Sequence, residues 1–199
     1  MPWGLVSGGW DNTVQYWDLR AGHAVRAIFG PHICGDALDV SADGTQLLTG
    51  SCRDENQLEL WDIAKGERIK ALPWRARGME EPACFLYTAR FSKDPHSSLI
   101  CAGGSFASAE DGGEAKVFHY GGAAPHAPNK CLGTVVHYTC LSADFGAPET
   151  GLLAMGGTDG RVRIMSLKPD NASKPSTATA GYRSQHSDLT SGSEVLGGS

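Results

Sequence analysis

The chain has 199 residues, 41% of them hydrophobic, which is enough to bury one sizeable core. Its formal net charge of −5 argues against a nucleic-acid or acidic-membrane partner held by bulk electrostatics, so neither is predicted. No apolar run approaches the length that spans a bilayer, and the N-terminus lacks the pattern of a secretory signal. We therefore expect a cytoplasmic protein, with the nucleus or a cilium left open as locations.

Six cysteines are scattered singly along the chain, without a Cys-x-x-Cys pair. Several lie in apolar, strand-like runs such as the one around Cys101, so we predict buried, reduced thiols. His32 and Cys34 have the spacing of half a metal site, but no second pair at zinc spacing accompanies them. The sequence therefore predicts neither a metal nor another cofactor.

The first predicted strands of the chain end in a Trp-Asp pair, Trp17-Asp18, that recurs at Trp61-Asp62. Residues 17–30 align without a gap on residues 61–74, with Trp, Asp, Gly and Ala at identical places. Such a match at this separation indicates a repeating unit of the kind found in arrays and propellers. We expect the two segments to be equivalent inner-edge strands of adjoining sheets.

Two further units follow in degraded form, with Phe118-His119 and Met165-Ser166 in place of the Trp-Asp pair. The four units cover residues 1–30, 31–74, 83–135 and 136–168. In each unit, short apolar or alternating runs separated by Gly- and Asp-rich turns predict strands. We expect an all-β chain with three strands in the first and last units and four in the middle two.

In its repeat length, its Trp-Asp pairs and its turn residues, the chain resembles the WD-repeat family of β-propellers. The resemblance covers roughly residues 3 to 167 and implies a partial propeller of about three and a half to four blades, arranged as an open arc. It looks like the C-terminal half of a seven-bladed ring. Residues 169–199 are rich in Ser, Thr and Gly and are predicted to form a disordered tail.

The resemblance also implies a hydrogen-bonded His–Ser/Thr–Asp–Trp set inside each blade. The matching residues are His32, Thr49, Asp54 and Trp61 in the second unit, Ser7, Asp11 and Trp17 in the first, and His137 and Asp159 in the fourth. A catalytic triad is the alternative interpretation of the same residue types. Because the set recurs in successive units, whereas a nucleophile would occur once, we interpret it as a structural network and predict no catalytic residue.

Propellers present their turns and loops as rigid binding surfaces, so exposed aromatic and basic residues in the turns are candidate contacts. In the family, the residue before the turn Asp lies on one rim of the ring. The candidates for protein binding are Trp10, Arg53 and Thr158 at that position, and Trp74, Arg75 and Arg77 in the loop after the second unit.

The resemblance implies a non-enzymatic scaffold that brings other proteins together, which is a family-level inference because a fold alone does not fix function. Alternatives are a truncated product of a longer WD-repeat protein without independent function, or an enzyme built on a propeller. An open arc leaves an apolar face bare at each end. We therefore expect the chain to need a missing propeller half or to associate with itself.

Overall fold

The structure is a computed structural model that describes residues 4–74, 83–107, 112–120, 130–136 and 138–167. Every regular element in these ranges is a β-strand, so the predicted all-β class is confirmed. The predicted disordered tail, residues 169–199, lies outside the described residues.

The strands form four antiparallel sheets, and each sheet is a meander in which neighbours in sequence are neighbours in space. The first sheet is β1 (Gly4–Gly8), β2 (Thr13–Asp18) and β3 (His23–Phe29). The second sheet is β4 (Leu38–Val40), β5 (Gln46–Gly50), β6 (Leu58–Asp62) and β7 (Glu67–Leu72). The third sheet is β8 (Cys84–Phe91), β9 (Leu99–Phe106), β10 (Gly113–His119) and β11 (Lys130–Val136). The fourth sheet is β12 (Cys140–Phe145), β13 (Leu152–Gly157) and β14 (Val162–Ser166).

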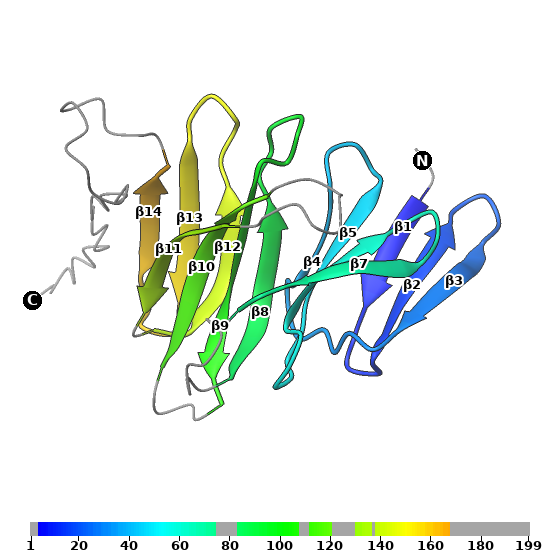
Figure 1. The fold of residues 1–199 in the computed structure, drawn as a ribbon, viewed down its shortest axis with the longest axis horizontal. Helices are drawn as coiled ribbons and strands as arrows, with labels where there is room; N and C mark the ends of the chain where they lie inside the picture. Colours follow the sequence, from blue (N-terminus) through cyan, green and yellow to red (C-terminus); the bar gives the residue numbers. More distant parts are fainter. Residues whose placement is uncertain (1–3, 75–82, 108–111, 121–129, 137, 168–199) are drawn as a thin grey trace, which may run out of the picture.

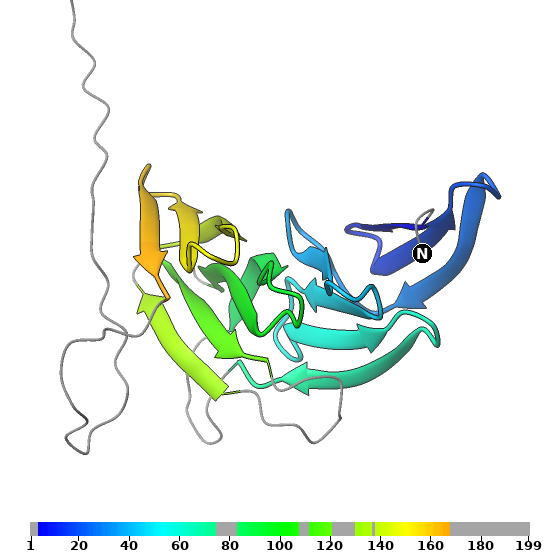
Figure 2. The same ribbon diagram turned by 90° about the horizontal axis from the view of Figure 1, so that it is seen from above.

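The four sheets follow one another side by side along an arc that does not close (Figures 1 and 2). The first and fourth sheets stand at opposite ends of the arc. This arrangement is a partial, open β-propeller, as the sequence predicted.

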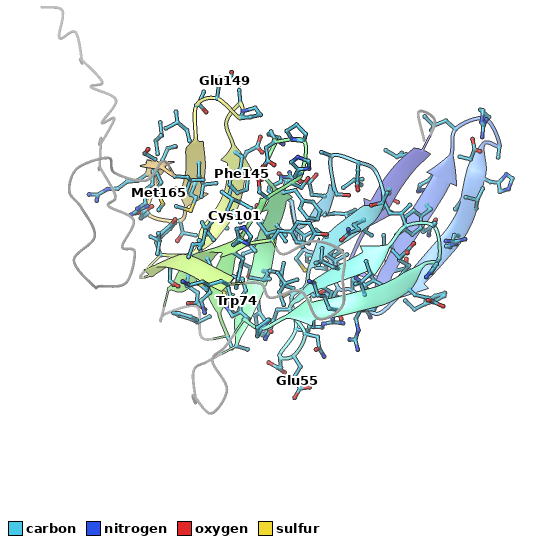
Figure 3. All side chains as sticks on the ribbon, turned by 45° about the horizontal axis from the view of Figure 1, so that its top comes forward. Glu55, Trp74, Cys101, Phe145, Glu149 and Met165 are labelled. Carbon is cyan, nitrogen blue, oxygen red and sulfur yellow. The ribbon has the colours of Figure 1, made fainter. Side chains whose placement is uncertain are left out.

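Apolar side chains fill the spaces between successive sheets. One buried cluster extends over the first three sheets and includes Val14, Leu48 and Ile100. A second lies between the third and fourth sheets and includes Cys101 and Phe145, both visible in Figure 3. The sheets approach closely at Gly50, where a Cβ atom would come within 3.2 Å of the Cβ of Ala89 in the third sheet. A side chain at Gly50 would therefore press on its neighbours in the adjoining sheet, which would have to move slightly to make room for it.

The segments around Trp17 and Trp61 do occupy equivalent positions in adjoining sheets. Trp17 pairs with Leu5 on β1 and Trp61 pairs with Leu47 on β5. The register also shifts at the same place in both sheets: immediately before Trp17 in the pairing of β2 with β3, and immediately before Trp61 in the pairing of β6 with β7. The expectation of an inner-edge position is wrong, because β2 and β6 each have a hydrogen-bonded strand on both sides.

Candidate interaction surface

The loops of the arc gather on two opposite rims. Figure 3 shows Glu55, in the loop between β5 and β6, on one rim and Glu149, in the loop between β12 and β13, on the other. The turn between β1 and β2 lies on the rim of the Glu55 loop (Figure 1). That turn carries Trp10, the most prominent of the predicted contact residues.

The Trp10 side chain is 74% exposed at the tip of a turn that is held from within. Asp11 accepts a hydrogen bond from the backbone N–H of Thr13 at 3.0 Å, and the side-chain and backbone hydrogen bonds of Thr13 lower the pKa of the Asp11 carboxyl. Asn12 has a backbone φ of 59°, a left-handed conformation that Asn tolerates better than most residues. The turn therefore presents the indole from a defined backbone rather than from a loose loop.

His32, in the linker to the second sheet, lies beside this turn. Its Nδ1 is 2.9 Å from Oδ1 of Asn12, and its ring centroid is 6.3 Å from that of Trp10. In the same linker, the Ile33 N–H donates to the Gly9 carbonyl at 3.1 Å. We call Trp10, Asn12 and His32 the Trp10 patch; it spans the boundary between the first two sheets.

Arg53 was predicted to be a contact residue, but its guanidinium is engaged inside the protein. Nη1 donates to the Gly30 carbonyl at 3.1 Å, Nε donates to the Asn56 carbonyl at 3.2 Å, and Nη2 pairs with Glu59. The Glu59 side chain is only 1% exposed, and it also accepts a hydrogen bond from Arg68 at 2.8 Å. Arg53 thus neutralises a buried carboxylate and ties the first two sheets together, so it has a structural role beside the predicted one in protein binding, which stays a prediction.

Trp74 was a candidate contact in the loop after the second unit, but it is buried. Its side chain is 4% exposed, and its indole donates a hydrogen bond to the Glu114 carboxylate on β10 at 2.6 Å. Lys116 closes the cluster, with its Nζ 2.7 Å from the Trp74 carbonyl oxygen and 5.0 Å from the ring centroid. The other two residues of that loop, Arg75 and Arg77, lie outside the described residues.

Thr158 is exposed in the turn between β13 and β14, at the opposite end of the arc from the Trp10 patch (Figure 2). Its neighbour Asp159 accepts from Arg163 Nη1 at 3.2 Å, and this interaction lowers the pKa of the Asp159 carboxyl. His137, the predicted partner of Asp159 in the blade network, lies outside the described residues. The predicted contact residues therefore do not form one continuous surface.

The predicted blade network is present only in part. The Trp61 indole donates to the Thr49 hydroxyl at 3.0 Å, and the Trp17 indole donates to the Ser7 hydroxyl at 2.9 Å. His32 is bonded to Asn12 of the preceding blade instead of to Thr49. The Asp54 residue is exposed, and its carbonyl accepts from the Gln57 side chain. These contacts position strands and turns, which fits the structural interpretation of the set.

The predicted burial of the cysteines is right for only half of them. Cys84, Cys101 and Cys140 are buried, and burial raises the pKa of Cys84 to about 12 and that of Cys140 to about 11. Cys34 and Cys52 are partly exposed and Cys131 is exposed, which corrects the prediction for these three. All six thiols are free. In the described part of the chain, no three His, Cys, Asp or Glu side chains gather where they could hold a metal ion.

Two features escaped the sequence reasoning. One is the buried Glu59 with its two arginines, whose only signal was an acidic residue between the apolar residues Leu58 and Leu60. The other is the linker contact of His32, which no spacing rule predicts because it depends on the left-handed Asn12. Among the described residues, no helix has the length and apolar character needed to cross a membrane.

No protein-family model matches the chain. The chain is 32% identical over 68 residues to Protein tipD of Dictyostelium discoideum and 35% identical over 65 residues to Protein Rae1 of Drosophila melanogaster. These matches cover 34% and 32% of this chain, but 11% and 18% of the relatives. The chain thus spans less than a fifth of the length of either relative.

Two solved structures share the fold at 20% sequence identity. A chain of the mitotic checkpoint complex superposes with a TM-score of 0.61 over 81% of this chain and 45% of its own length. The computationally designed Ika4 protein superposes with a TM-score of 0.58 over 83% of this chain and 86% of its own length. Together, the arc of four sheets and these two structures show a partial β-propeller fold, and the paired Trp-Asp segments resemble those of WD-repeat propellers.

Proposed function

We propose that the chain is a non-enzymatic scaffold and that the Trp10 patch is a contact with a partner protein. The observation that carries the proposal is the 74% exposed indole of Trp10, held on a turn whose backbone is fixed from within. Leaving so large an apolar ring in water is unfavourable, and tryptophan is among the residues enriched in binding hot spots. A rigid turn also reduces the entropy that is lost when a partner binds.

Further support comes from the relatives and from the surroundings of the patch. One structure with this fold is a chain of the mitotic checkpoint complex, which agrees with a protein as the partner. Asn12 and His32 beside the indole supply polar groups for a rim around an apolar centre. A cytoplasmic location remains part of the same proposal.

The test is affinity capture from cell extract with the wild-type chain, with Trp10→Ala and with Leu19→Ala. Leu19 is the matched control, because it is a 58% exposed apolar residue in the other turn of the same sheet. We expect Trp10→Ala to reduce recovery of at least one specific protein by at least about tenfold, which corresponds to a loss of roughly 1.4 kcal/mol in binding free energy. The Leu19→Ala chain should capture that protein as well as the wild type does. Equal recovery with all three chains would contradict the proposal. Arg53 is not mutated in this test, because its removal would leave the buried Glu59 carboxylate with only Arg68 as a counter-charge.

A further inference from the structure

Among the residues that the structure describes, no element covers the outer sheet face at either end of the arc. On the first sheet, Leu5 pairs with Trp17, and Thr13 pairs with Phe29, which places these side chains on one face. Leu5 is 53% exposed and Phe29 is 76% exposed. The opposite face of the same sheet carries Val14, which is fully buried against the second sheet. We call the uncovered face, with Leu5, Trp17 and Phe29, the first end face.

The fourth sheet has an uncovered face of the opposite kind. Ala154 pairs with Ile164, and Gly156 pairs with Val162, so these residues share one face of the sheet. Val162 is 60% exposed and Ile164 is 36% exposed. Leu153, which points the other way, is fully buried against the third sheet. We call the face with Ile164 and Val162 the second end face.

The interior of the arc shows how these two kinds of face fit together. Leu47, which pairs with Trp61, is the counterpart of Leu5 and is fully buried beneath the first sheet. Leu60, the counterpart of Ile164, is likewise fully buried, on the face that packs on the third sheet. Each contact inside the arc therefore joins two different faces. The face of one sheet that corresponds to the second end face packs on the face of the next sheet that corresponds to the first end face. Within the described residues, one face of each kind is left over.

The composition of the end faces favours burial. The side chains that share the first end face, Leu5, Ser7, Thr13, Gln15, Trp17, Ala27 and Phe29, carry no charge. Among the described residues of the three strands, one charged residue, Asp144, shares the second end face, and its carboxylate is already paired with Lys93 at 3.0 Å. Absence of unpaired charge is the compositional mark of an interface core. Because the two faces stand at opposite ends of the arc (Figure 2), one chain cannot join its own two faces.

We propose that the occupant of each end face is a second copy of this chain, bound head to tail, with the second end face of one copy on the first end face of the other. Such a contact repeats the packing found inside the arc. The contact is heterologous, because it joins two different faces. Two copies can form it twice, once at each end of the arc, and all four end faces are then covered. Burial of these apolar side chains provides the driving force.

The test is the mass of the chain in solution, measured by sedimentation velocity or by light scattering over a range of concentrations. The variants are Phe29→Glu on the first end face and Val162→Glu on the second, with Leu19→Glu as an exposed apolar control in a turn. We expect the wild type and the control to reach twice the 21.0 kDa of one chain. Each end-face variant should remain a monomer, with a dissociation constant raised about 100-fold or more, because a carboxylate would be buried without a partner.

An equimolar mixture of the two end-face variants gives the sharpest result. Each variant keeps one usable face, and the two usable faces are of opposite kinds, so the mixture should form a heterodimer that neither variant forms alone. A wild-type chain that stays monomeric at all concentrations would overturn the proposal, and this measurement needs no variant to fold. Self-association of either variant alone at the wild-type concentration would also overturn it. Trp10→Ala should leave the mass of the assembly in solution at that of a dimer, which separates this proposal from the one on the Trp10 patch.

Discussion

The indole of Trp61 donates a hydrogen bond to the Thr49 hydroxyl at 3.0 Å, between two strands of the buried second sheet. The same bond recurs in the first sheet between Trp17 and Ser7, where it lies on an uncovered face. Two copies of one contact thus differ mainly in their access to water.

That difference predicts unequal costs of removal. Thr49→Val keeps the shape of the side chain but leaves the buried Trp61 N–H without an acceptor, so the free energy of unfolding should fall by about 1–3 kcal/mol. Ser7→Ala should cost no more than about 0.5 kcal/mol, because water can replace the hydroxyl. Urea denaturation of the three chains measures both values, and equal losses would show that the Thr49 site is not buried.

Glu59 provides a second stability test. Its carboxylate is 1% exposed between Arg53 and Arg68, so Glu59→Gln leaves two guanidinium groups without their counter-charge. We expect a loss of about 3 kcal/mol in the free energy of unfolding, moderated because Arg68 is half exposed. Glu67→Gln, the same change at an exposed position on β7, is the control and should have little effect. Similar midpoints for the two variants in a urea titration would rule out the buried ion cluster.

Asp43 predicts a defined pH dependence. The Ser41 hydroxyl and the backbone and side chain of Thr45 donate to its carboxylate, and these bonds hold its pKa below the ordinary value of 3.8. Because the unfolded chain then binds this proton more readily, the contribution of Asp43 to stability is present above pH 3.8 and is lost as the pH falls further. Asp43→Asn should therefore be less stable than the wild type at neutral pH, and the gap should narrow below pH 3.8. A gap that is constant from neutral to acid pH would show that the carboxylate is not preferentially charged in the fold.

The thiols should react in an order set by their exposure. Alkylation with iodoacetamide at neutral pH, followed by mass spectrometry of peptides, should modify the exposed Cys131 first. Cys52 should lag behind, since burial and the neighbouring Cys34 raise its pKa to about 11. Cys84, Cys101 and Cys140 should react only after denaturation. Early modification of Cys101 would contradict the packing between the third and fourth sheets.

Local patterns in the sequence were sufficient to predict the strands and their grouping into sheets. Alternating runs, turn residues and the recurrence of Trp17 at Trp61 all follow from contacts within one repeat. The Trp-to-hydroxyl bonds at Thr49 and Ser7 were expected from the resemblance to WD repeats and not from these patterns; in both, donor and acceptor lie on neighbouring strands.

Contacts between sheets were not predictable in this way. The burial of Trp74 depends on Glu114 and Lys116, which the next sheet brings to it across a long stretch of sequence. The role of Arg53 depends on Glu59 and on the Gly30 carbonyl of the preceding sheet. In both cases a residue that looks like a surface contact in the sequence is needed inside, because it satisfies a buried charge.

The central claim is that successive sheets stack face to face, so that residues distant in sequence meet between them. A double-mutant cycle on Trp74→Phe and Glu114→Ala tests this most directly, because their 2.6 Å hydrogen bond joins the end of the second sheet to the third, and alanine has no side-chain acceptor. The structure predicts a coupling of at least about 1 kcal/mol in the free energy of unfolding. Additive effects within about 0.3–0.5 kcal/mol would mean that the two residues do not touch, and the stacked arc would then be wrong.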